Sequence, residues 1–352
     1  MSSGVNCTPR LLENFTFETP LPYNCSDTSG PDCEKHVTFF DVGHKYVDSL
    51  HPDIELTSVT TLIHGYFPEF EAVKISETIS RNPKSLYYGK TPIEIRDGWE
   101  KNRNEAATLG TNLHKAIESI YNGHPVCEPK KELELFRNFH NDLIDRVPYK
   151  TERIVCSREA RITGSIDMIY KDSLGFHHVY DWKRSKEIKM EARDTGFFPL
   201  TEFQNTNYSH YCLQLNIYSY LLDTLYGYNV KSMTLVILHP EQDNYITIPV
   251  PPLREPVIQL IKHFIDHGFL LPRAFESRFG HKIIKNKLTD KTTMSSSGEV
   301  IDKKDDMVDK IKDKVITDGN KTDEKTRIEI KNSMKKDRFG TTLVLPTPKR
   351  RI

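Results

Sequence analysis

The sequence lacks two features that mark large classes of proteins: a long apolar run and a paired cysteine motif. No segment of the 352 residues approaches the roughly 20 apolar residues that a membrane-spanning helix needs. The six cysteines are scattered, form no Cys-x-x-Cys pair and follow no metal-ligand spacing, so we expect reduced thiols. The segment from Met1 to Asn24 has neither the basic start nor the apolar run of a signal peptide. We therefore expect an intracellular protein, nuclear or cytoplasmic, that does not contact a membrane.

The chain also has no excess of charge. Its 49 Lys and Arg residues balance 49 Asp and Glu residues, so the formal net charge is zero. There is no global field to attract a nucleic acid, and such a partner would need a local basic groove. Charged residues make up 28% of the chain and apolar residues 37%, which is typical of a soluble globular protein.

Composition divides the chain into three parts. Residues 1–34 are rich in Pro, Asn, Ser and Thr without sustained periodicity, and we expect a loosely ordered leader. Residues 281–352 are dominated by Lys, Asp, Thr and Ser, a composition that opposes packing, and we expect a disordered tail. The folded domain should therefore span residues 35–280.

Periodicity within this domain predicts a mixed α/β (α+β) fold, with a central mixed sheet flanked by helices and a helical N-terminal part. Helical patterns occupy Ala72 to Ser80, Pro92 to Lys101, Ala106 to Tyr121, Lys131 to Val147, Tyr208 to Leu225 and Pro252 to His267. Strand patterns occupy a hairpin over Val37 to Asp48 that turns at Gly43, then Leu56 to Ile63, Arg153 to Ile162, Ser165 to Tyr170, Phe176 to Lys183, Ser232 to His239 and Asn244 to Val250.

Two carboxylates and a lysine should converge on neighbouring strands. Successive side chains of a strand alternate between faces, so Asp181 and Lys183 share one face. The turn at 172–175 lets the preceding strand pair with this one, which brings Asp167 toward Asp181. Two carboxylates this close repel each other unless a cation lies between them, and Mg²⁺ prefers such ligands. With Lys183 beside the metal, the pattern favours hydrolysis of a phosphodiester bond. An Asp-x-Lys pair is common on exposed strands, so the pair alone is weak evidence for a nuclease and the surrounding motifs must support it.

That context resembles a known family. Four motifs occur in the order seen in RecB-like nucleases of the PD-(D/E)XK superfamily: Gly110-Thr111-x-x-His114-x-x-x-Glu118, Gly164-Ser165-Ile166-Asp167, Asp181-Trp182-Lys183 and Gln214-x-x-x-Tyr218. The resemblance spans roughly Leu56 to Val250. It is strongest to RecB-like exonucleases of large DNA viruses and to mitochondrial genome maintenance exonucleases.

The resemblance implies a restriction-endonuclease-like core and a deoxyribonuclease that depends on Mg²⁺ or Mn²⁺. It implies an exonuclease acting on single-stranded or end-containing DNA in replication, repair or recombination, with a large DNA virus as one source. Residue by residue, it makes His114, Asp167 and Asp181 metal ligands and Lys183 the catalytic amine. A structure-specific endonuclease and a catalytically silent DNA-binding protein remain alternatives.

The resemblance also implies roles that the residues alone leave open. Glu152 matches a Glu on the first core strand of related nucleases, with Glu159 as a competitor, and either could simply face solvent. Gln214 and Tyr218 would brace the site or touch DNA, although Tyr218 could be ordinary helix packing. Arg184 would meet phosphates, with a solvated loop charge as the alternative.

Other residues have weaker assignments. His114 could be a core histidine, and Glu118 could be a surface carboxylate rather than a neighbour of the metal. Aromatic residues near the site could stack on unpaired bases or belong to the core: Phe197, Phe198, Tyr208 and Tyr211.

Two absences qualify the resemblance. Some relatives bind an iron–sulfur cluster through three clustered downstream cysteines, which this sequence lacks, so we expect no such cluster. The chain also lacks the Gly-x-x-x-x-Gly-Lys-Ser/Thr motif of a nucleotide-driven motor. Any unwinding of duplex DNA would then come from a helicase or another replication or repair protein.

Overall fold

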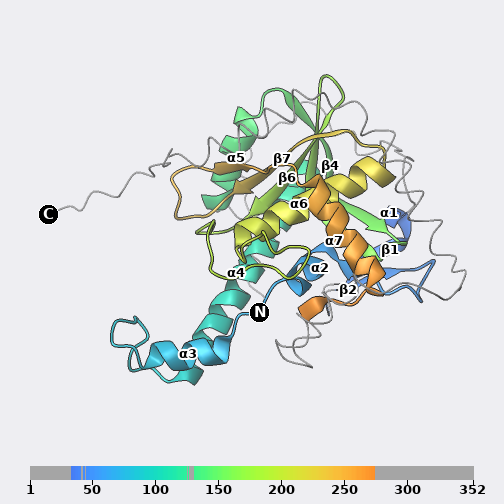
Figure 1. Ribbon diagram of the computed structural model, residues 1–352. Coiled ribbons are helices and arrows are strands. Elements are labelled where there is room, and N and C mark those ends of the chain that lie inside the picture. The colour runs from blue at the N-terminus through green and yellow to red at the C-terminus, as the bar shows by residue number, and fades with distance from the viewer. Residues whose placement is uncertain (1–32, 41–42, 44, 125, 127–130, 274–352) are drawn as a thin grey trace, which may run out of the picture. The chain divides into compact units, whose positions relative to one another are not determined.

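The computed structural model describes residues 33–40, 43, 45–124, 126 and 131–273 (Figure 1). Most of the expected leader and all of the expected tail lie outside these residues. The helices are α1 (Cys33–His36), α2 (Val59–Gly65), α3 (Ala72–Ser80), α4 (Pro92–Tyr121), α5 (Lys131–Asp142), α6 (Asn207–Leu225) and α7 (Arg254–Asp266). The strands are β1 (Val37–Phe40), β2 (Lys45–Asp48), β3 (Thr57–Ser58), β4 (Arg146–Ser157), β5 (Ile162–Asp172), β6 (His177–Lys183), β7 (Val230–Ile237) and β8 (Ile246–Pro249).

The main sheet is mixed, as the sequence predicts. Its strands run in the order β3-β5-β6-β7-β8, and β4 pairs with the other edge of β5. The β3–β5 and β6–β7 pairs are parallel, whereas β4–β5, β5–β6 and β7–β8 are antiparallel. The separate β1–β2 hairpin is also antiparallel and turns at Gly43, whose φ of 83° suits glycine.

Helices cover both faces of the sheet, which gives two buried clusters (Figure 1). The first cluster joins α2, α6 and α7 to side chains such as Val179 and Leu235. The second joins α4 and α5 to the opposite face, through Tyr180 and Trp182. Alternation along β6 therefore sends Val179 to one layer and its neighbour Tyr180 to the other. The mixed α/β class is confirmed.

Four element predictions are wrong in their bounds. The strand predicted over Arg153 to Ile162 crosses a turn, because β4 ends at Ser157 and Ile162 begins β5. The residues from Pro92 to Tyr121 form one 30-residue helix and not two, begun by a capping box between Thr91 and Glu94. The segment Leu56 to Ile63 forms only the two-residue strand β3 before α2 begins, because the Ser58 hydroxyl accepts a hydrogen bond from Thr61 N–H and caps the helix.

The last error concerns the end of α5. The predicted helix over Lys131 to Val147 ends at Asp142, and β4 begins at Arg146 and includes Pro148. Proline cannot donate to a ladder, but it is tolerated on an edge strand. Within the described residues β4 pairs with β5 alone, so Pro148 needs no donor on its outer edge.

Two further expectations bear on compartment. No helix in the described part of the chain is both long and apolar enough to cross a membrane. Cys156 is disulfide-bonded, so the expectation of reduced thiols is wrong for this residue, whereas Cys212 is a buried free thiol.

Candidate active site and metal centre

The site lies in a gap between two strands, β3 and β6, that pair with the same edge of β5. On this edge β3 pairs with Ile162 and Thr163, and β6 pairs with β5 only from Met168 onward. Residues 164–167 have no ladder partner there among the described strands. The Asp167 side chain turns into this gap, and its Oδ2 accepts a hydrogen bond of 2.8 Å from the N–H of Trp182.

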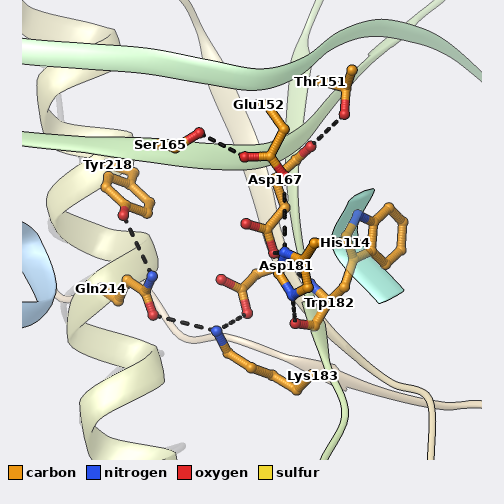
Figure 2. A network of polar contacts seen from close by, with 10 residues as sticks. All are labelled: His114, Thr151, Glu152, Ser165, Asp167, Asp181, Trp182, Lys183, Gln214 and Tyr218. Carbon is orange, nitrogen blue, oxygen red and sulfur yellow. Dashed lines mark hydrogen bonds and ion pairs between the residues drawn. The ribbon is translucent and has the colours of Figure 1, made fainter. Parts of the chain in front are cut away.

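The main chain of Trp182 holds a second site residue from the opposite layer. His114 of α4 places its Nε2 2.9 Å from the Trp182 carbonyl oxygen. A carbonyl only accepts, so Nε2 carries the proton of this hydrogen bond. The other ring nitrogen, Nδ1, lies 3.5 Å from Asp167 Oδ2 and 3.8 Å from Glu152 Oε1. The imidazole therefore presents Nδ1 to two carboxylates (Figure 2).

Glu152 reaches the site through an unusual backbone conformation. Its φ is 46°, in the left-handed region that few residues other than glycine adopt. On either side of it Thr151 pairs with Met168 and Arg153 with Ile166, but Glu152 itself forms no ladder pair with β5. Its Oε2 accepts a 2.8 Å hydrogen bond from Ser165. Backbone strain of this kind is concentrated at functional sites.

Strand β6 supplies the positively charged side chain of Lys183 and its partner Asp181. Lys183 Nζ lies 2.6 Å from Asp181 Oδ2, and the Asp181 side chain is 3% exposed. The two groups form an ion pair. Within the described structure neither carboxylate oxygen of Asp181 accepts a hydrogen bond. Lys183 Nζ also donates to Gln214 Oε1 at 3.5 Å and lies 4.5 Å from the ring centroid of Tyr211.

Helix α6 contributes Gln214 and Tyr218 to the site. Gln214 Nε2 donates to the Tyr218 hydroxyl at 3.4 Å, so the Gln-x-x-x-Tyr pair forms a chain of contacts with Lys183 (Figure 2). Tyr218 is buried and packs against Gly164, where a Cβ atom would come within 2.7 Å of its hydroxyl. The glycine of the Gly-Ser-Ile-Asp motif therefore makes room for this tyrosine.

Charge is unbalanced within the site. Three carboxylates, Glu152, Asp167 and Asp181, face one lysine and one histidine. Burial opposes the charged form of His114, but Asp167 and Glu152 outweigh it and raise the pKa of the imidazole to about 9. Burial raises the pKa of Asp167, and it raises that of Asp181 to about 6 despite Lys183. A bound cation would relieve this excess of negative charge.

These residues fit a divalent cation. One ligand atom each from His114, Glu152 and Asp167 lie within 4.8 Å of one another. The set of one imidazole nitrogen and two carboxylate oxygens suits Mn²⁺ or Mg²⁺. The sequence predicted Asp181 as a metal ligand; in the structure Asp181 pairs with Lys183, and Glu152 is the third residue of this group.

Most of the sequence-predicted residues come together, and a few do not. His114, Glu152, Asp167, Asp181, Lys183, Gln214 and Tyr218 form one network (Figure 2). Arg184 instead donates to Glu132 of α5 at 2.8 Å, with side chains 14% and 8% exposed. Glu159 is exposed in the turn after β4 and bonds to Ser157. Glu118 is half-buried, and burial with the charge of Glu152 raises its pKa.

Sequence reasoning missed two features of the site. The first is the contact of Tyr211 with Lys183; its spacing of three residues from Gln214 on a helix could have indicated it. The second is Tyr46 of the hairpin: burial and the charge of Glu152 raise its pKa to about 12. Nothing in the spacing of the hairpin indicates that Tyr46 lies near the charge of Glu152.

Comparison with known proteins adds little to this geometry. No family model matches the chain, and no curated protein matches it. A solved structure described as "Crystal structure of SSO0001" is similar over 64% of this chain and 82% of its own, with 18% sequence identity and a TM-score of 0.30. A likeness of this size carries no argument about activity.

Proposed function

We propose that this protein is a metal-dependent deoxyribonuclease that acts from the ends of single-stranded DNA. The observation that carries the proposal is the hydrogen bond from His114 Nε2 to the Trp182 carbonyl. It fixes the imidazole so that Nδ1 faces Asp167 and Glu152, and such anchoring of the second nitrogen is typical of metal-binding histidines. The resemblance to RecB-like nucleases supplies the substrate class.

A divalent cation held by His114, Glu152 and Asp167 would polarise the scissile phosphate and lower the pKa of a bound water. The chain's own contribution is the ammonium of Lys183. Burial alone would lower the pKa of this amine, but Asp181 and Asp167 outweigh it and raise the pKa above its ordinary value. Lys183 is therefore a proton-bearing donor at neutral pH. It can stabilise the negative charge that develops on the phosphate.

Asp181 has a different part in this proposal. It lies 2.6 Å from Lys183 Nζ and is buried, so it holds the ammonium in the site. Gln214 adds a second contact to the same nitrogen. The proposed setting is DNA replication, repair or recombination, with duplex unwinding left to a partner such as a helicase.

The test uses single-stranded DNA labelled at the 5′ or the 3′ end and a closed circular form of the same sequence. With Mg²⁺ or Mn²⁺ the wild-type protein should degrade linear DNA progressively and spare the circle, and EDTA should stop the reaction. Cutting of the circle would identify an endonuclease of the same site. Binding of both substrates without metal-dependent cleavage would contradict the proposal and favour a silent DNA-binding protein.

A further inference from the structure

Three groups surround the Lys183 ammonium, and one of them is an aromatic ring. Nζ lies 2.6 Å from Asp181 Oδ2, 3.5 Å from Gln214 Oε1 and 4.5 Å from the centroid of the Tyr211 ring. The lysine side chain is 16% exposed, so water competes little for these contacts. An ammonium within about 6 Å of a ring centroid is attracted by the ring quadrupole, and the attraction grows when the pair is desolvated.

We propose that Tyr211 is a positioning residue that holds Lys183 in its working orientation, an inference that rests on the proposed nuclease function. A lysine side chain is a flexible four-carbon stem with three rotatable donors, so one ion pair does not fix where its ammonium points. Asp181 is a neighbour on the same strand, whereas Tyr211 and Gln214 approach from α6. Contacts from two elements define the position of Nζ better than a single one.

Tyr211 is itself well placed for this role. It lies one turn after Asn207, which fastens the segment that follows Lys183: Asn207 Oδ1 accepts from Lys189 N–H at 2.8 Å, and Nδ2 donates to the Glu187 carbonyl at 3.0 Å. The ring is half-buried. A base-stacking platform offers an open ring face, whereas one face of this ring contacts an ammonium that lies largely buried. The geometry therefore favours a contact with lysine over a contact with DNA.

Steady-state kinetics on linear single-stranded DNA separate these roles. Tyr211→Leu should lower kcat about 2- to 30-fold, as expected for loss of one cation–π contact, with KM little changed. Tyr211→Phe keeps the ring and should restore most of the turnover. Tyr220→Leu is the matched control, because Tyr220 lies on the same helix and its ring contacts Arg254 outside the site. A change confined to KM, or an equal loss in Tyr211→Phe, would overturn the proposal.

A spectroscopic readout decides the geometry without any activity. In protein labelled with [13Cε]lysine, the Lys183 signal is the one absent from Lys183→Arg, and protons over a ring face are shifted upfield. The shift should persist in Tyr211→Phe and Tyr220→Leu and disappear in Tyr211→Leu. If Tyr211→Leu does not fold, Tyr211→Met takes its place. A signal that is unchanged on loss of the ring would refute the proposal, whereas failure of the nuclease assay alone would refute only the proposed function.

Discussion

The phenol of Tyr218 rests directly on the backbone of Gly164, where a Cβ atom would come within 2.7 Å of its hydroxyl oxygen and 2.8 Å of a ring carbon. The two residues belong to different motifs, one on β5 and one on α6. Their contact sets how closely α6 approaches the strand that carries Asp167. A side chain at position 164 would push α6, with Gln214, away from Lys183.

Gly164→Ala should therefore destabilise the protein by about 1–3 kcal/mol, the usual cost of overpacking a core. Gly110→Ala is the matched control: this glycine lies within α4, and an added Cβ would meet nothing within 4 Å. Alanine is the better helix former, so this change should stabilise by about 1 kcal/mol. Urea denaturation measures both. Equal effects of the two substitutions would show that Tyr218 is not held by Gly164.

Lys183→Ala should abolish cleavage of DNA while leaving most of the binding affinity, because it removes one donor from a surface that keeps its other contacts. Turnover is followed on end-labelled oligonucleotides, and binding by fluorescence anisotropy with EDTA present. Lys231→Ala, which changes a lysine that contacts Phe176, serves as control and should behave as wild type. Turnover near wild type in Lys183→Ala would remove this residue from the chemistry.

His114→Ala should weaken Mn²⁺ and Mg²⁺ binding by at least the roughly 10- to 100-fold that loss of a ligand's hydrogen-bond partner costs. Imidazole suits Mn²⁺ better than Mg²⁺, so Mn²⁺ affinity should fall more. Calorimetry measures both ions, and Glu152→Gln should show the same direction of change. His124→Ala removes an exposed histidine beyond the end of α4 and is the control. Unchanged affinity in both site variants would move the metal elsewhere.

Arg184→Ala should act on stability more than on DNA binding. Its guanidinium pairs with the buried Glu132, and breaking such a pair from one side costs about 3–5 kcal/mol, because it leaves an uncompensated charge. The double variant Arg184→Met with Glu132→Leu should recover most of that loss. A phosphate contact predicts the opposite pattern: unchanged unfolding and a weaker dependence of DNA affinity on salt.

Acid should destabilise the fold through His263. Its Nδ1 lies 2.8 Å from the Tyr66 hydroxyl, and burial, with a smaller effect of His267, lowers its pKa to about 4. The unfolded value is about 6.5, so the unfolded chain binds the proton first as the pH falls. The free energy of unfolding should thus decrease as the pH falls from 6.5 to 4. His263→Gln should flatten this slope in urea titrations, and an unaltered slope would contradict the assignment.

The sequence predicts the sheet and most of the site because both depend on short-range patterns. Alternation along β6 places Asp181 and Lys183 on one face, and helical spacing places Gln214 beside Tyr218. The mixed α/β class follows from the order of strand and helix patterns. Each of these depends on residues that are close in sequence.

What the sequence does not predict depends on long-range contacts. Arg184 looks like a loop cation until α5 brings Glu132 against it, 52 positions away. The position of Glu152 beside His114 depends on a positive φ that no side-chain pattern encodes. Spacing alone also cannot tell whether Asp181 meets a metal ion or the Lys183 ammonium, with which it pairs in the structure.

Trp182 connects the site to the core behind it. Its main chain forms hydrogen bonds with Asp167 and His114. Its indole contacts Phe136 and Phe139 of α5, whose ring centroids each lie 5.5 Å from that of Trp182. Loosening of this part of the core would therefore displace Asp167 and His114 together. On heating, the capacity to bind metal should disappear at the same midpoint as the near-ultraviolet signal of Trp182, followed in a Trp99→Phe background, in one cooperative transition.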